Sequence, residues 1–165
     1  DYSPTERETL LTIDTPWKVD FQKGMRGPDE TYVMTELQTW DKNEDEHIRY
    51  FSGTATYTNT FKLKKQPDQP VWIDLGRVMV MARVYVNNQY AGGVWTSPYR
   101  LNIQHLLHKG TNTLRVEVVN NWQNRLIGDQ KLPENERPTW TSVNPWRADS
   151  PLQESGLVGP VRLLQ

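Results

Sequence analysis

A strict alternation of apolar and polar side chains runs from Thr54 to Leu63, and it constrains the fold more than any other feature. One face of this segment carries mainly apolar residues, and the other carries threonines and Lys62. Because successive side chains of a β-strand point to opposite faces of a sheet, this period of two predicts a long, half-buried strand. Such a strand is typical of an antiparallel sheet with one face on the core.

Shorter segments repeat the same period, and Gly, Pro and Asn residues separate them. The pair Asn87–Asn88 predicts a hairpin turn with positive φ. We therefore expect about eight strands and no long helix, a pattern typical of an all-β, antiparallel β-sandwich of the jelly-roll type. The shorter segments are Trp17–Phe21, Val71–Leu75, Val80–Val86, Tyr99–Ile103, Leu114–Val118 and Val161–Leu164.

Helical signals are few and short. Thr35–Gln38 has the form of a capping box, which predicts a single helical turn through Trp40. Asn102 can cap a second short turn that ends at Leu107. The acidic cluster between residues 41 and 46 is typical of a solvated loop.

The length of 165 residues predicts one domain. It is too short for a complete (β/α)8 barrel, which needs about 250 residues. We assign residues 15–165 to a single β-sandwich and residues 1–14 to a poorly fixed lead-in segment. No signal peptide is visible, and Asp1 is typical of the start of a processed chain or an excised fragment.

Charge and composition exclude several classes of partner and site. The formal net charge is −1, from 19 basic and 20 acidic residues, so we expect no nucleic-acid partner. No apolar run approaches the roughly 18 residues of a membrane span, so we expect no membrane partner. Cysteine is absent, which excludes disulfides and thiolate metal sites.

The sequence predicts no catalytic residue. Glycoside hydrolysis needs two carboxyl groups that face each other about 5 to 9.5 Å apart. The acidic cluster of residues 41–46 lies in one charged loop, and Asp74 ends a strand, where a turn role is expected. The three histidines adjoin no nucleophile motif, and their spacing favours no metal site. We predict no cofactor, and a structural calcium ion held by loop oxygens stays an open alternative. The histidines are His47, His105 and His108.

The segment Asn120–Asp129 breaks the alternation of the strand before it and concentrates amide, indole, guanidinium and carboxylate groups. We interpret it as a loop that an Arg125–Asp129 pair stiffens. Sugar recognition needs aromatic faces for the C–H side of a pyranose and polar groups for its hydroxyls. This segment and the aromatic residues outside the strand interiors meet that need. The candidate ligand-binding residues are Trp95, Tyr99, Trp122, Asn124, Arg125, Asp129, Trp140 and Trp146.

Several motifs, taken in order, resemble a known family. The most specific are Ser52-Gly-Thr-Ala-Thr-Tyr57 and Trp122-Gln-Asn-Arg-Leu-Ile-Gly-Asp129. The turn Gly110-Thr-Asn-Thr-Leu114 and the hairpin Val84-Tyr-Val-Asn87 occur in many sugar-binding sandwiches, and Ser155-Gly-Leu-Val-Gly-Pro160 ends the series. Together they resemble the galactose-binding-like β-sandwich of glycoside hydrolase family 2 type. The likeness is greatest to the domain near the C-terminus of bacterial α-L-rhamnosidases of glycoside hydrolase family 106, and it covers roughly residues 15–165.

The resemblance implies an accessory role. In such enzymes the catalytic carboxylates lie in a separate barrel, so the isolated domain is not expected to be an enzyme but to be part of one. The resemblance further implies carbohydrate and the catalytic domain of the parent hydrolase as partners. It also implies a secreted, periplasmic or cell-surface location in a bacterium that degrades polysaccharide.

Alternatives remain at this point. The segment Asn120–Asp129 could contact sugar, stabilise the fold, or contact a neighbouring domain. The whole chain could instead be a structural docking domain without a ligand, which would fit an exposed apolar patch where Met79, Met81 and Tyr85 point away from the core. A small independent glycosidase is the third alternative.

Overall fold

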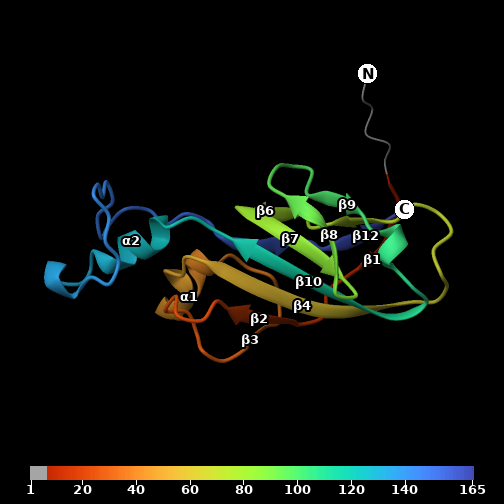
Figure 1. The fold of residues 1–165 in the computed structure, drawn as a ribbon, viewed down its shortest axis with the longest axis horizontal. Helices are drawn as coiled ribbons and strands as arrows, with labels where there is room; N and C mark the ends of the chain where they lie inside the picture. Colours follow the sequence, from red (N-terminus) through yellow and green to blue (C-terminus); the bar gives the residue numbers. More distant parts are fainter. Residues whose placement is uncertain (1–6) are drawn as a thin grey trace, which may run out of the picture.

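Two antiparallel sheets form the body of the computed structural model, which describes residues 7–165 (Figure 1). The larger sheet has the strand order β3-β2-β4-β10-β7-β8, and the smaller sheet has the order β1-β12-β5-β9. A two-stranded ribbon pairs β11 with β6. The strands of the larger sheet are β2 (Trp17–Phe21), β3 (Tyr32–Met34), β4 (Thr54–Leu63), β7 (Met81–Val86), β8 (Gln89–Val94) and β10 (Gly110–Val119). The others are β1 (Thr9–Thr12), β5 (Trp72–Asp74), β6 (Arg77–Met79), β9 (Arg100–Asn102), β11 (Gly156–Gly159) and β12 (Arg162–Leu164).

The core lies on the inward faces of the central strands. Val116 of β10 stands opposite Tyr57 of β4 and Val84 of β7, and all three side chains are fully buried. Ile73 and Leu163 from the smaller sheet belong to the same buried cluster. Burying each such apolar side chain stabilises the fold by roughly 1.5–3 kcal/mol. The predicted all-β, antiparallel sandwich is confirmed.

The local predictions around the long strands hold. Strand β4 begins and ends at the predicted residues and pairs with β2 on one side and β10 on the other. Asn87 and Asn88 have φ values of 50° and 64°, which confirms the hairpin between β7 and β8. The side-chain oxygen of Asn102 accepts a hydrogen bond from the backbone N–H of Gln104 at 3.1 Å, and the short helix η2 (Gln104–Leu106) follows.

The predicted boundary between a lead-in and the sandwich needs correction. Within the predicted lead-in, β1 pairs with β12, and Ile13 is buried. A register shift between Thr9 and Leu11 interrupts the pairing, and at this point the sequence has two consecutive leucines, Leu10 and Leu11, instead of an alternation with polar residues. This irregularity hides the strand from a search for a period of two. Residues 1–6 of the predicted lead-in lie outside the described part of the chain.

The predicted helical turn at Thr35–Gln38 is wrong. Those residues are irregular, and a short helix η1 (Trp40–Lys42) begins only after them. A further short helix, α1 (Glu46–Arg49), begins inside the acidic segment that we interpreted as a solvated loop. Asp45 caps α1, because its carboxylate accepts a hydrogen bond from the backbone N–H of His47 at 2.9 Å. The acidic residues at this point therefore include a helix cap.

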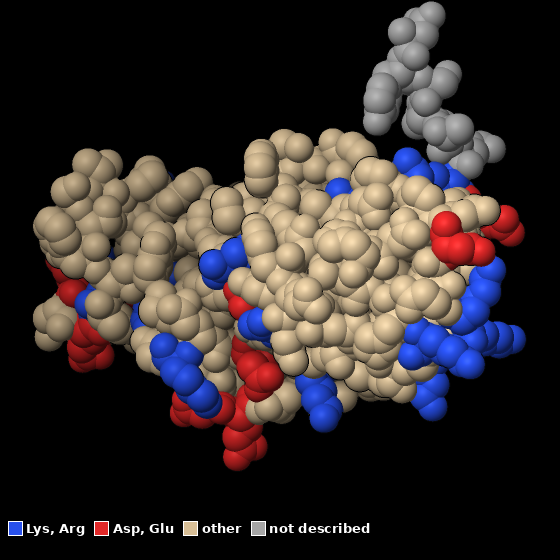
Figure 2. Space-filling view, turned by 45° about the vertical axis from the view of Figure 1, so that its right-hand side comes forward, with Lys and Arg blue, Asp and Glu red and all other residues tan. Residues whose placement is uncertain are grey.

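The two ends of the sandwich differ. Helices α1 and α2 (Gln123–Asp129) lie together at one end, where β10 ends and β4 begins, and the C-terminus lies at the other end (Figure 1). In the view of Figure 2, basic side chains gather at the end opposite α2, and much of the face is uncharged. In the described part of the chain, no helix has the length and apolar character needed to cross a membrane. The end that carries α2 holds the candidate site.

Candidate functional site

Helix α2 replaces the loop that the sequence predicts after β10. Its buried residues are Asn124, Arg125, Ile127 and Asp129, of which only one is apolar. A helix whose buried face is polar has no apolar period of 3.6 residues, so the usual helical signal is missing from this segment. The side chains of this polar face hold α2 in place.

Asn124 fixes α2 to the segment that precedes β11. Its Nδ2 donates to the carbonyl of Gln153 at 2.7 Å, and the Gln153 N–H donates to its Oδ1 at 2.8 Å. The Asn124 amide thereby satisfies both the backbone N–H and the backbone carbonyl of Gln153, as a neighbouring strand would. Asn124 is only 1% exposed, so the structure does not bring this predicted ligand contact to the surface.

Asn120 fixes the junction between β10 and α2. Its Oδ1 accepts from the N–H of Gly53 at 2.9 Å, and its Nδ2 donates to the carbonyl of Phe51 at 2.9 Å. The same Nδ2 lies 3.1 Å from the hydroxyl oxygen of Ser155. These contacts join the segment before β4 to the end of β10, and they fix the point in the chain from which α2 begins.

Gly128 lets α2 approach Tyr50 closely. A Cβ at this position would lie 2.7 Å from Cγ and 2.9 Å from Cβ of Tyr50, which is buried. Real Cβ contacts are not this short, so any larger residue would push α2 away from Tyr50.

We predict that Gly128→Ala lowers the free energy of unfolding by about 1–3 kcal/mol, because it overpacks this contact. Urea denaturation measures the effect. Gly93→Ala is the matched control, because the nearest atom to its added Cβ would lie 3.5 Å away, and its cost should stay within about 0.5 kcal/mol. Equal stability of the two variants would contradict the close packing of α2.

Asp129 lies beneath the surface of the site and binds a residue that the sequence did not suggest. Its two carboxylate oxygens accept from Nη1 and Nη2 of Arg26 at 2.9 and 3.0 Å, a bidentate pair. The predicted Arg125–Asp129 pair is only a 4.0 Å contact between Nη1 and Oδ1, which is too long for a hydrogen bond. Asp129 is therefore hydrogen-bonded to Arg26, and the predicted Arg125–Asp129 pair is present only as a longer ion pair.

Arg26 was missed because it lies 103 residues before Asp129 in the chain. It has a left-handed backbone, with φ of 60°, in the turn between β2 and β3. The following Gly27 packs so closely on the ring of Phe51 that a Cβ there would lie 2.8 Å from it. This turn had only its glycines as a signal, and glycines alone do not indicate which side chain the turn presents.

Arg125 is buried with unsatisfied donors. Its side chain is 10% exposed, yet in the described residues its Nε and Nη2 atoms are buried and have no hydrogen-bond acceptor. Burial lowers the pKa of the Arg125 guanidinium, and Arg26 lowers it further, whereas Asp129 raises it. An arginine side chain is not deprotonated in proteins, so the group stays charged at neutral pH.

A cleft of about 550 Å³ lies between the β2–β3 turn, α2 and the long loop that follows α2. Trp122 is 52% exposed and Trp140 is 86% exposed at this cleft, and the guanidinium of Arg125 forms part of its wall. Its size falls within the range of small-molecule sites, roughly 300–1,000 Å³. The lining residues are Gly24, Met25, Arg26, Trp122, Arg125, Leu126, Pro138, Thr139, Trp140 and Thr141. We call this the tryptophan cleft.

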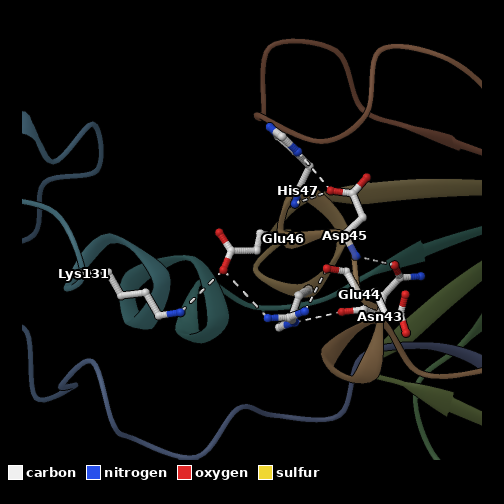
Figure 3. A network of polar contacts seen from close by, with 7 residues as sticks. Asn43, Glu44, Asp45, Glu46, His47 and Lys131 are labelled. Carbon is white, nitrogen blue, oxygen red and sulfur yellow. Dashed lines mark hydrogen bonds and ion pairs between the residues drawn. The ribbon is translucent and has the colours of Figure 1, made fainter.

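A second hollow of about 610 Å³ shares Gly24, Arg26 and Arg125 with the tryptophan cleft. Charged side chains from α1 and from the end of α2 line it, and Figure 3 shows how they meet. Glu46 lies 3.7 Å from the Lys131 ammonium and 3.8 Å from the Arg49 guanidinium. The exposed carboxylate of Glu46 is therefore already beside two basic partners.

The structure brings together only some of the predicted ligand residues. Trp122, Arg125 and Trp140 line the tryptophan cleft, and Asp129 supports it through Arg26. Trp95 follows β8, and Tyr99 precedes β9, so both belong to another part of the sandwich. Trp146 is half-buried in the long loop and lines neither hollow. Within residues 7–165, no three His, Asp or Glu side chains gather as a metal-binding group would.

Known proteins share this architecture. A rhamnosidase from Novosphingobium sp. PP1Y is similar over 99% of this chain, with 41% identity and a TM-score of 0.89. A Formosa agariphila protein named as a β-glucuronidase is 34% identical over 89% of this chain. A β-glucuronidase from Ruminococcus gnavus has a TM-score of 0.59 at 19% identity, over 70% of this chain and 22% of its own, which shows the fold alone. This chain spans 16% of the rhamnosidase and 15% of the Formosa protein.

The sequence profile of one family matches residues 31–152, which include β3 to β10, α2 and most of the long loop. The match includes most of the sandwich core and the part of the tryptophan cleft that α2 and the long loop form, but not Gly24, Met25 and Arg26 of the β2–β3 turn. The chain therefore belongs to the glycosyl hydrolase 2 galactose-binding domain-like family.

Proposed function

We propose that this domain is a non-catalytic carbohydrate-binding module of a larger bacterial glycoside hydrolase of the α-L-rhamnosidase type, which acts on polysaccharide. The observation that carries the proposal is the tryptophan cleft, whose lining includes two exposed tryptophans and a buried arginine. Indole faces cover the apolar side of a pyranose, and donors in the cleft satisfy its hydroxyl groups. The small share of the rhamnosidase that this chain spans supports a module within a longer protein.

The lining of the cleft supports binding without catalysis. None of the residues that line the tryptophan cleft carries a carboxylate. Asp129, which is buried, is hydrogen-bonded to Arg26 of this lining. Since glycoside hydrolysis needs two facing carboxyl groups, we assign the chemistry to a catalytic domain elsewhere in the parent protein. We further propose that the parent works outside the bacterial cytoplasm, where polysaccharide is found.

Titration of the 165-residue chain with rhamnose-, galactose- and uronic-acid-containing polysaccharides tests the proposal. We predict that at least one of them binds and that Trp122→Ala and Trp140→Ala each weaken its binding by about tenfold or more. Trp95→Ala is the matched control, because Trp95 is 68% exposed but lies away from the cleft. Affinity electrophoresis or calorimetry gives the ratios. Binding of none of the polysaccharides, or equal loss in all three variants, would contradict the proposal.

A second candidate function is docking of a neighbouring domain, and one surface favours it. Met81 and Tyr90 are exposed on β7 and β8, and Val80 and Trp95 are exposed beside these strands. Met79 and Tyr85 are half-buried, and none of these residues belongs to the core. Comparing the thermal stability of the whole parent enzyme with that of its Met81→Asp variant tests this role, and an unchanged stability would oppose it.

A further inference from the structure

Arg125 presents donors that the fold does not use. A guanidinium has five N–H donors, and leaving a charged donor buried without an acceptor destabilises a fold more than leaving a neutral one. Within residues 7–165, the buried Nε and Nη2 atoms of Arg125 have no acceptor. Its backbone N–H is engaged with the hydroxyl of Ser52 at 3.3 Å, so the backbone of this residue is fixed. Arg125 therefore lines the cleft with a fixed backbone and with two buried donors that no described residue satisfies.

The charged groups at the cleft carry an excess of positive charge. Arg26 uses both oxygens of Asp129 and also donates to the hydroxyl of Thr139 at 3.0 Å. Arg125 only approaches Asp129, at 4.0 Å. Two guanidinium groups thus face one carboxylate. An incoming anion would complete the pairing of Arg125.

The shape of the Arg125 guanidinium and the residues around it determine which kind of anion fits the cleft. An arginine fork matches the planar geometry of a carboxylate, which it can bind through two parallel hydrogen bonds. Around Arg125 the cleft offers indole faces from Trp122 and Trp140 and hydroxyls from Thr139 and Thr141. Indoles and hydroxyls suit a sugar ring, and the guanidinium suits an acid attached to that ring.

We propose that the tryptophan cleft recognises uronic acid residues of a polysaccharide, with the sugar carboxylate paired with the Arg125 guanidinium. This inference rests on the proposed carbohydrate-binding function and adds the chemical class of the sugar. Arg26 is the positioning partner, because it occupies Asp129 and leaves Arg125 for the ligand.

A pair of ligands that differ only in charge tests the inference. The 165-residue chain is titrated by calorimetry with an oligogalacturonate and with the methyl ester of the same oligomer. Because charge-assisted hydrogen bonds to carboxylate are lost in the ester, we expect the acid to bind at least about tenfold more tightly. In Arg125→Met the ratio should fall to about one. Arg115→Met is the control that should keep the ratio, since Arg115 pairs with Glu117 on another face of the sheet.

The outcomes separate the inference from the proposed function. Equal binding of acid and ester by the wild-type chain, with both still dependent on Trp122, overturns the acidic-sugar inference and leaves carbohydrate binding in place. Binding of a sulfated neutral glycan in preference to the uronate also overturns it. Loss of all glycan binding overturns both.

A measurement on the wild-type chain tests the inference even if the Arg125→Met variant does not fold. The Nε–H signal of Arg125 in the NMR spectrum of the wild-type chain should shift with the acid and stay in place with the ester. A signal that moves equally with both ligands contradicts the inference.

Discussion

Replacing Asp129 with alanine is expected to lower the free energy of unfolding by about 3 kcal/mol, the lower end of the range for breaking a buried ion pair. The variant removes the only carboxylate that Arg26 binds among the described residues and leaves two guanidinium groups side by side in the same site. Arg26 is 34% exposed, so water partly compensates its lost partner and the higher values of the range do not apply. Urea denaturation of the 165-residue chain measures the change.

Two comparisons make the Asp129 prediction specific. Asp68→Ala removes an exposed pair with Lys65, and it should cost no more than about 0.5 kcal/mol. The double variant Asp129→Ala with Arg26→Met removes one of the two uncompensated charges and should recover part of the loss. A cost for Asp129→Ala as small as that of Asp68→Ala would show that the pair does not hold the site.

The second large effect is expected at Asn124. Asn124→Ala should lower the free energy of unfolding by about 2–4 kcal/mol, because it leaves the partly buried N–H and carbonyl of Gln153 without their partner. It should also weaken glycan binding by about tenfold. The reason is that α2 carries Arg125 and is fastened to the segment before β11 through this amide.

Hydrogen exchange measures this local effect directly. The Gln153 amide should lose protection in Asn124→Ala, whereas Asn135→Ala, in the exposed short helix η3 (Glu134–Glu136), should leave it unchanged. If the Gln153 amide exchanges at the wild-type rate in Asn124→Ala, then Asn124 does not hold α2 and the predicted loss of binding has no basis.

The fold could be predicted to the extent that one face of each strand is apolar. Strand β4 and the hairpin at Asn87–Asn88 follow from alternation and from turn chemistry, and both hold in the structure. Strand β1 could not be found in this way, because a register shift breaks its alternation. The short helix α1 escaped because its cap, Asp45, looks like one more charge in an acidic run.

The candidate site was predictable in composition but not in geometry. Trp122, Arg125 and Trp140 were identified because they are aromatic or charged residues outside the strand interiors, and the structure brings them to one cleft. Arg26 was not identified, since a contact across 103 residues leaves no local pattern. Helix α2 was not identified either, because its buried face is polar and its anchors are amides rather than apolar side chains. Tertiary contacts between distant segments decide both features.

The tryptophan cleft as a sugar-binding site is the central claim, and NMR of the tryptophan side chains tests it most directly. The chain has seven tryptophans, so each indole N–H gives a signal that can be followed during titration with an oligosaccharide of the polysaccharide that binds. We predict that the indole signals of Trp122 and Trp140 shift and saturate together, and that the exposed Trp95 signal stays in place. A shift confined to Trp95, or no shift of any indole at saturating glycan, would contradict the claim.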